Sequence, residues 1–505
     1  MNGKLHSETG AFSSDDMRAE ILNPFVHKLE LDNTYDKIKT AIFTVILLPF
    51  RVIVICYLIV TAWFLACIGL YGLSEEDLRR QPMTGWRSKL RFSILSLMRL
   101  VVVAAGFHRV RVLGRHHVPS NSREAPVVVI APHSSFFDAI AIVCLGAPSV
   151  VAKADTARLP FIGQLINYTQ PVYVWRDDPN SRQNTIKEII ERATSKEDWP
   201  QVLIFPEGTC TNRSCLITFK PGGFYPGVPV QPVTIRYPNA RDTVTWTWEG
   251  PGALKLLWLT LTQVHSSCEI EFLPVYYPSE EEKRDPKLYA RNVRDVMAKA
   301  LGVPVLDYTY DDCRLIARAK QLGIPCATSA REVSEIRGQL GLERSRLELH
   351  LCAQWGQGLQ AAHTRARWVA PDEFALRLGV HRDGPAMRLF DIFMQRSSGL
   401  VYFPDYLLCA AFLSLQHAPL SQLLSIAFKL YDSSRTGRLN LANFEEVATR
   451  CLGLCQEDAH NTFQQADLDE KGYLTYDEFI SYAQKKAEFA FVFACDATHP
   501  KPKTQ

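Results

Sequence analysis

The stretch Val127–Asp138, VVVIAPHSSFFD, carries the strongest indication of fold and chemistry in the chain. Its run of β-branched residues is typical of a buried strand, and Pro132–Ser135 is typical of the turn into a helix. His133 and Asp138 cannot share one face of an ideal helix, but they can meet if His133 lies in the loop and Asp138 in the first turn. The carboxylate would then hold one ring nitrogen and leave the other as a base. We also expect the helix N-terminus to keep this imidazole neutral.

A second pair with the same spacing, His27 and Asp32, shows that the spacing alone proves little. That pair follows no strand-like run and precedes a long apolar segment, whereas His133 comes at the end of a strand. Sheets with parallel strands place their sites at the carboxyl ends of the strands. The sequence therefore favours His133 and Asp138 as the catalytic pair.

The region around this stretch has the pattern of an α/β domain with a largely parallel sheet and helices on its faces. Helical stretches such as Ser181–Arg192 and Pro286–Ala300 alternate with strand-like apolar runs. The runs lie at residues 109–113, 127–131, 149–152, 171–175, 201–205, 229–236 and 268–275.

Composition limits the classes of function. The chain has 505 residues, enough for two or three domains, and its net charge of +3 is too balanced for a general nucleic-acid binder. Its 13 cysteines do not form the paired CxxC sets of a zinc site and indicate reduced thiols in a cytosol-facing protein. Residues 1–20 are polar and mixed in charge, so we expect no cleavable signal peptide.

An apolar segment at residues 41–71 contains a single charged residue, Arg51. The part Val52–Tyr71 is long enough to cross the hydrocarbon core of a bilayer. Pro49 divides the segment, which could therefore span the membrane or bend back as a re-entrant hairpin. The shorter apolar stretch at 92–107 suits a helix that lies in the membrane interface.

Three further pieces of the α/β region are candidates for a site. One strand opens into Glu207-Gly208-Thr209, a turn whose backbone N–H groups could hold an anion or a developing oxyanion. Another ends at Arg176, whose guanidinium could bind a phosphate. The proline-bounded run at 227–233 could form the wall of a groove. Each piece alone has an ordinary structural explanation. Because all of them lie in one α/β region, together they favour a functional site.

In this order, HSSFFD, the strand ending at Arg176, FPEGTCTNRS and PVQPV resemble the four motifs of glycerolipid acyltransferases. The chain is most similar to the membrane-bound lysophosphatidylcholine acyltransferases that carry C-terminal EF-hands. The resemblance implies that His133 is a general base oriented by Asp138, and that Arg176, Glu207, Gly208 and Thr209 contribute to acceptor binding. It implies transfer from acyl-CoA or acetyl-CoA to a lysophospholipid without an acyl-enzyme and without a cofactor for the chemistry.

One departure from the family pattern bears on the acceptor. Many lysophosphatidate acyltransferases have arginine where Cys210 stands, and an arginine there suits a dianionic phosphate monoester. We therefore expect a choline-type acceptor, unless Arg213 takes over that role. Acetyl transfer to the alkyl-lyso form would give platelet-activating factor. Acylation of lysophosphatidate, or a non-catalytic membrane-tethered EF-hand adaptor, are the alternatives.

The C-terminal part contains two stretches that resemble EF-hand loops, in which oxygen ligands recur at fixed positions. The loop at 467–478 fits at positions 1, 3, 6, 9 and 12 but has a lysine at position 5. The loop at 432–443 ends on asparagine in place of the bidentate glutamate. Candidate Ca²⁺-binding positions are Asp467, Asp469, Lys471 (position 5, with a non-ligating side chain), Tyr473 and Glu478, and more weakly Asp432, Ser434, Thr436, Arg438 and Asn443.

The last five residues place Lys501 and Lys503 as in the dilysine retrieval signal of endoplasmic reticulum membrane proteins. We therefore expect the endoplasmic reticulum membrane, with the Golgi and lipid droplets as further candidates and with the catalytic and EF-hand parts facing the cytosol. The expected partners are acyl-CoA, a lysophospholipid and the membrane, and no nucleic acid.

The sequence thus predicts a membrane-anchored α/β acyltransferase domain followed by an all-α EF-hand-like domain. The expected divisions are 1–40 N-terminal segment, 41–71 membrane anchor, 72–106 interfacial helical segment, 107–310 catalytic domain, 311–384 helical connector, 385–490 EF-hand-like module and 491–505 tail.

Overall fold

The computed structural model describes residues 23–29, 31, 33–175, 180–355, 367–415, 420–432, 437–451, 456–467 and 469–479. The chain divides into two compact units, residues 1–310 and 311–504.

The first unit is built on a seven-stranded sheet with the strand order β1-β7-β6-β2-β5-β3-β4. The strands β6, β2, β5, β3 and β4 are parallel, whereas β7 runs antiparallel to β6. Its elements are α2 Thr34–Leu70, α3 Glu75–Arg80, α4 Gly85–Ala104, β1 Arg109–Leu113, β2 Val127–Ala131, α5 Ala139–Cys144, β3 Ser149–Lys153, α6 Ile162–Asn167, β4 Val172–Val174, α7 Ser181–Ala193, β5 Val202–Ile204, β6 Val230–Arg236, α8 Ala253–Leu261, β7 Ser267–Phe272, α9 Glu280–Arg284 and α10 Pro286–Leu301. The predicted α/β fold class is confirmed.

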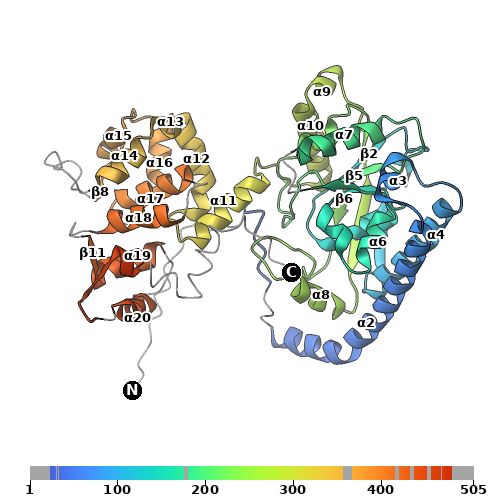
Figure 1. Ribbon diagram of the computed structural model, residues 1–505, viewed down its shortest axis with the longest axis horizontal. Coiled ribbons are helices and arrows are strands. Elements are labelled where there is room, and N and C mark those ends of the chain that lie inside the picture. The colour runs from blue at the N-terminus through green and yellow to red at the C-terminus, as the bar shows by residue number, and fades with distance from the viewer. Residues whose placement is uncertain are drawn as a thin grey trace. The chain divides into compact units, whose positions relative to one another are not determined.

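Alternate residues of β2 enter two different hydrophobic cores because successive side chains of a strand point to opposite faces. Val127 and Val129 pack in the core that contains residues of α7 and α10. Val128 and Ile130 pack in the core on the other face, with residues of α5 and α8. Figure 1 shows α7 and α10 on one side of these strands and α8 on the other. All five residues of β2 are fully buried, which explains its continuous apolar sequence.

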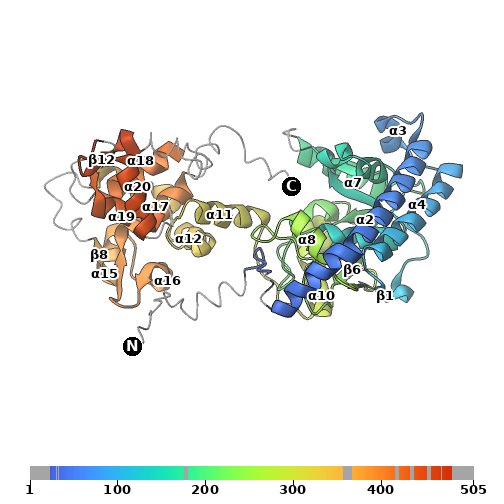
Figure 2. The same cartoon turned by 90° about the horizontal axis from the view of Figure 1, so that it is seen from below.

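Helix α2 is the one described helix that is long and apolar enough to cross a membrane, by length and composition only. It is continuous through Pro49 and contains 37 residues, about 55 Å at 1.5 Å per residue. It runs antiparallel to α4, because Arg87 near the start of α4 donates to the carbonyl of Gly69 near the end of α2. Figure 2 shows the two helices side by side.

Arg51 is buried in the middle of α2 and connects it to helix α8, which covers one face of the sheet. Its guanidinium donates to the carbonyls of Leu261, Gln263 and Val264 at 2.8, 2.6 and 2.9 Å. Leu261 is the last residue of α8 and the other two follow its C-cap, so the guanidinium lies at the helix end that favours a cation. The charge that interrupts the apolar segment therefore has a structural role.

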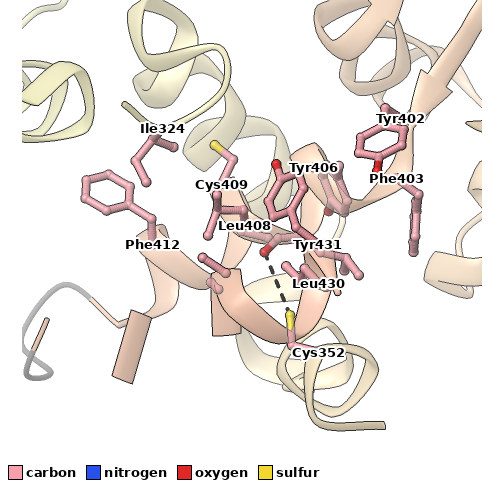
Figure 3. Packing of buried hydrophobic residues seen from close by; sticks show 14 of the residues in the cluster. Ile324, Cys352, Tyr402, Phe403, Tyr406, Leu408, Cys409, Phe412, Leu430 and Tyr431 are labelled. Atoms are coloured by element: carbon pink, nitrogen blue, oxygen red, sulfur yellow. Dashed lines mark hydrogen bonds between the residues drawn. The ribbon is translucent and has the colours of Figure 1, made fainter. Parts of the chain in front are cut away.

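The second unit is mainly helical and has one hydrophobic core, part of which Figure 3 shows. In that view, the Cys352 thiol donates to the carbonyl of Leu407 at 3.9 Å. The elements are α11 Tyr310–Gln321, α12 Ala330–Gln339, α13 Leu342–Ser345, α14 Leu347–Gln354, β8 Trp368–Val369, α15 Pro371–Leu378, α16 Gly384–Phe393, β9 Met394–Gln395, β10 Leu400–Tyr402, α17 Phe403–Ser414, α18 Leu420–Tyr431, β11 Arg438–Asn440, α19 Leu441–Cys451, α20 Gln456–Ala466 and β12 Tyr473–Thr475.

Two short antiparallel ribbons organise this unit. In one, Leu439 of β11 pairs with Leu474 of β12, which are the eighth positions of the two EF-hand-like loops. In the other, Val401 of β10 pairs with Val369 of β8. Strand β10 also pairs with β9, and these two strands lie between α16 and α17. Strand β11 lies between α18 and α19, and β12 follows α20. The first of these strands, β8, falls within the stretch at 311–384.

Candidate active site

The site lies at the carboxyl ends of three neighbouring strands. In the sheet, β2 is flanked by β6 and β5, and all three are parallel. His133 follows β2, Glu207 follows β5, and Tyr237 directly follows β6. Since the carboxyl ends of parallel strands meet at one edge of the sheet, residues far apart in sequence come together there.

His133 and Asp138 form the pair that their spacing suggests. His133 Nδ1 lies 2.8 Å from Asp138 Oδ2, and the side chain of His133 retains 24% of its exposure. Asp138 ends a short turn, Phe136–Asp138, that Ser135 caps, so it lies in the first turn after the loop. The backbone N–H groups of Ser134 and Ser135 also donate to Asp138 Oδ2, at 2.7 and 3.0 Å. Asp138 is thereby fixed, and it holds the ring through Nδ1, so Nε2 is the nitrogen that can take a proton.

The pKa of His133 corrects the expectation of an imidazole kept neutral by a helix N-terminus. Burial alone would lower this pKa, but the neighbouring Cys210 sulfur and the Asp138 carboxylate outweigh it, and the pKa of His133 lies well above its usual value. The helix that follows, α5, has only six residues, so its dipole lowers the pKa of His133 less than the contacting Asp138 carboxylate raises it. The ring of Phe205 stacks on the imidazole with 4.3 Å between centroids.

Glu207 lies beneath the base and is 1% exposed. Its Oε2 accepts the backbone N–H of His133 at 2.6 Å, and its Oε1 accepts that of Ile217 at 3.3 Å. Burial raises the pKa of Glu207 to about 7, with the two backbone donors and His133 acting against that rise. In this structure the carboxylate joins the loop after β2 to the loop after β5.

Gly208 and Thr209 follow Glu207 on the exposed side of this turn. Gly208 has φ +66, and a Cβ there would lie 2.7 Å from Lys220 Nζ, so a residue with a side chain would be strained and crowded. In the described part of the chain, the backbone N–H groups of Gly208 and Thr211 donate to protein carbonyls, whereas no such acceptor is recorded for those of Thr209 and Cys210. These two groups are therefore candidates to bind an anion.

Arg213 lies beside the base, with its charge compensated. Its Nη2 is 2.5 Å from Asp242 Oδ2, and its Nη1 donates to Ser134 Oγ at 3.0 Å. Burial opposes ionisation of Asp242, but Arg213 and Thr245 prevail and lower the pKa of Asp242. The pair therefore adds no net charge to the site. Arg176, the other predicted phosphate ligand, lies outside the described residues.

The segment at residues 23–27 supports the same loop. The Asn212 side-chain amide donates to the carbonyls of Asn23 and Val26, and the backbone N–H of Asn212 donates to Pro24. His27 of the rejected pair contacts the backbone carbonyl of Asp242 at 3.0 Å, and Asp32 lies outside the described residues.

Known proteins resemble this chain over nearly its whole length. The family model for acyltransferases matches residues 109–236, and that for an EF-hand domain pair matches residues 421–484. The chain is 43% identical over 484 residues to the Drosophila melanogaster lysophosphatidylcholine acyltransferase, covering 95% of this chain and 89% of that one. Against human lysophosphatidylcholine acyltransferases 1 and 2 the identities are 42% and 40%, covering 95% and 93% of this chain and 90% and 84% of theirs. The chain belongs to the lysophosphatidylcholine acyltransferase family. The prediction of an acyltransferase enzyme is thereby confirmed.

The EF-hand pair of this acyltransferase is present, and its better loop has a cation among the candidate Ca²⁺ ligands. Lys471 Nζ contacts Glu478 Oε1 and lies 3.5 Å from Asp469 Oδ2, so an ammonium stands among the expected ligands. Asp467 accepts the backbone N–H groups of Lys471 and Gly472. The described residues contain no group of three His, Cys, Asp or Glu side chains placed to hold a metal ion.

The preceding loop is only partly within the described residues. Asp432 Oδ2 accepts the backbone N–H of Gly437 at 2.8 Å, whereas Ser434 and Thr436 lie outside the described part. Arg438 and Asn440 form strand β11, and Asn443 is buried at the twelfth position.

Sequence reasoning missed two residues of this acyltransferase site, Tyr237 and Asp242. Tyr237 donates from its hydroxyl to Asp138 Oδ1 at 2.7 Å across 99 residues of sequence. A signal was present, because Tyr237 is a polar residue directly after a buried strand. Asp242 had no such signal, since it lies in an irregular stretch.

Proposed function

We propose that the chain transfers an acyl group from acyl-CoA to the free hydroxyl of a lysophospholipid, with lysophosphatidylcholine as the acceptor and His133 as general base. The observation that carries this proposal is the 2.8 Å contact between His133 Nδ1 and a fixed Asp138, at the carboxyl end of a central strand. The curated relatives are named for lysophosphatidylcholine, which supports the acceptor class.

The proposed reaction needs one proton to move twice. His133 Nε2 takes the proton of the lysophospholipid hydroxyl as its oxygen attacks the thioester carbonyl. The carbonyl oxygen becomes an oxyanion, for which the N–H groups of Thr209 and Cys210 are the candidate donors. When the carbon–sulfur bond breaks, CoA leaves and takes the proton from the imidazolium, so the enzyme returns to its starting state. No residue of the chain is acylated.

The pairing of Arg213 with Asp242 supports a zwitterionic acceptor. Arg213 is paired with Asp242, and Cys210 supplies no cation. A phosphocholine diester carries its own compensating cation, whereas lysophosphatidate brings a dianionic phosphate that would need an uncompensated one. Acylation of lysophosphatidate is the alternative, and similar kcat/KM values for the two acceptors would favour it. Acetyl transfer to the alkyl-lyso form belongs to the same chemistry.

We further propose that α2 and α4 hold the enzyme at the endoplasmic reticulum membrane, with both units on the cytosolic side. The outward side chains of α2 support this, since Val45, Ile53 and Tyr57 are 76%, 70% and 69% exposed. The dilysine pattern of Lys501 and Lys503, outside the described residues, also supports it, and the Golgi and lipid droplets are further candidates.

The test is His133→Ala in the full chain, purified in detergent micelles. We expect acyl transfer to lysophosphatidylcholine to fall by about 10² to 10⁴-fold with an unchanged melting temperature. The matched control is His116→Ala, at an exposed position outside the site. A His133→Ala protein as active as the wild type would end the proposal and favour the non-catalytic adaptor. The assay should cross lysophosphatidylcholine, its alkyl analogue and lysophosphatidate with acetyl- and palmitoyl-CoA, with and without Ca²⁺.

A further inference from the structure

The two carboxylate oxygens of Asp138 accept hydrogen bonds from different donors. Oδ2 accepts from His133 Nδ1 and from two backbone N–H groups. Among the described residues, the donor recorded for Oδ1 is the Tyr237 hydroxyl, at 2.7 Å. Asp138 is 1% exposed, so water does not replace that donor readily. The rotation of the carboxylate therefore depends on Tyr237 at one end and on the His133 loop at the other.

Tyr237 is built to remain a donor. It is 7% exposed and directly follows β6, which is paired with β2 along its length. Burial, and next the charge of Asp138, raise the pKa of this phenol well above its usual value. The Arg213 guanidinium lies over its ring at 5.4 Å from the centroid, and Phe107 packs against the ring edge. The hydroxyl thus stays protonated and its direction is fixed by the packing of the ring.

We propose that Tyr237 is a positioning residue for the acyl transfer, holding Asp138 so that His133 presents Nε2 and limiting the negative charge that Asp138 directs at the imidazole. This inference rests on the proposed role of His133 as the base. A hydrogen bond to a carboxylate draws off part of its charge, so a carboxylate without it stabilises the imidazolium more strongly.

The variant Tyr237→Phe removes the hydroxyl and keeps the ring. We expect kcat for transfer to fall by about tenfold, with KM for acyl-CoA nearly unchanged, because one charge-assisted hydrogen bond is lost. We also expect the midpoint of the pH profile of kcat/KM to move upward, since the His133 imidazolium becomes harder to deprotonate. A fluorinated tyrosine at position 237, a stronger donor, should move the midpoint downward.

The matched control is Tyr289→Phe. Tyr289 is fully buried and donates to the carbonyl of Val228 at 2.8 Å, away from the base, so its loss should not move the pH profile. A Tyr237→Phe protein that keeps the wild-type midpoint, while His133→Ala is inactive, would overturn the positioning role and leave the proposed base intact. An active His133→Ala protein would overturn both.

A second and independent observation concerns the loop at 467–478. Lys471 Nζ contacts Glu478 Oε1, and Glu478 Oε2 accepts from the backbone N–H and hydroxyl of Thr475, both at 2.9 Å. The lysine thus stands at the fifth ligand position and satisfies the carboxylate that would otherwise close the loop on a metal ion.

We infer that the Lys471 ammonium replaces Ca²⁺ in this loop, so that the EF-hand pair keeps its closed ribbon without the metal. Calorimetric titration of the full chain with Ca²⁺ should then show no saturable binding that depends on Glu478. Lys471→Asp, which supplies a fifth-position oxygen, should create such binding with at least about 100-fold higher affinity.

The control for the charge change is Lys429→Asp, at an exposed position on α18 that lies in neither loop. The double variant Lys471→Asp/Glu478→Gln should lose the created site. Wild-type binding that Glu478→Gln abolishes, or a Lys471→Asp protein that binds no better than wild type, would overturn the inference.

Discussion

The buried carboxylate of Glu207 accepts the backbone N–H of His133 at 2.6 Å. Glu207 lies in the turn after β5, and its side chain is therefore directed inward, toward the loop that carries the base. Its second oxygen accepts the N–H of Ile217, so one side chain joins three segments of the chain.

Replacing Glu207 by glutamine should disorganise this junction. A glutamine has one acceptor oxygen, so its amide N–H₂ would face one of the two backbone N–H groups and leave it unsatisfied. We expect a loss of about 1 to 3 kcal/mol in unfolding free energy and reduced transfer. Thermal unfolding of Glu207→Gln measures this loss, with the exposed Glu197→Gln as the control. Equal melting temperatures of the two variants would contradict the role of Glu207 in joining the loops.

Glu207 should also make stability depend on pH. Burial raises its pKa to about 7 from an ordinary 4.5, so the folded state binds this proton more tightly than the unfolded chain. The contribution of this carboxyl to stability is therefore greatest below pH 4.5 and falls as pH rises to about 7, by at most about 3 kcal/mol. Unfolding measured across that window should show the fall in the wild type and a weaker one in Glu207→Gln.

Activity should change with pH in the opposite direction. The pKa of His133 lies above its usual value, because Cys210 and Asp138 outweigh the effect of burial. Since only the neutral imidazole accepts a proton, kcat/KM should rise with pH through the neutral range and level off above the pKa. The stabilisation from the charged imidazole is lost over the same rise. A pH profile that falls from pH 6 to 8 would contradict this assignment.

The pairing of Arg213 with Asp242 predicts a change of acceptor preference. In Asp242→Asn the guanidinium loses its compensating charge and becomes available to a phosphate. We expect the ratio of kcat/KM for lysophosphatidate to that for lysophosphatidylcholine to rise by about tenfold, equivalent to about 1.4 kcal/mol. Asp198→Asn, in an exposed ion pair with Arg123, is the control, and an unchanged ratio in Asp242→Asn would refute the prediction.

Loss of Arg51 should destabilise the first unit. Arg51→Leu keeps the helix apolar but leaves three carbonyls, at the end of α8 and just after it, without this donor. We expect a cost of the order of 3 kcal/mol, seen as a lower melting temperature in detergent. Arg99→Leu, at an exposed position on α4, should have little effect. Equal melting temperatures of the two variants would show that Arg51 does not stabilise the packing of α2 against α8.

The features that sequence reasoning found are those encoded locally. The strands were found because their apolar runs end at prolines, glycines or polar residues, and His133 with Asp138 because they lie in one loop. The contact of Tyr237 with Asp138 spans 99 residues and depends on the pairing of β6 with β2. Strand order cannot be deduced from the local pattern, so neither could this contact.

The second unit shows the same limit. The loops at 432–443 and 467–478 were found through their glycines and oxygen-bearing residues. Beside the ribbon of Val369 with Val401, the stretch at 391–405 keeps only Asp391, Gly399 and Asp405 of such a pattern. A fold that has no ligand pattern in its loops leaves little trace in sequence.

The hydrogen bonds of Arg51 mean that helix α2 is not an interchangeable module. A chimaera carrying a foreign helix of equal hydropathy in place of α2 would leave the end of α8 uncapped and the first unit less stable. An engineered variant that exchanges α2 must therefore carry a cation at the position of Arg51, or rebuild the end of α8.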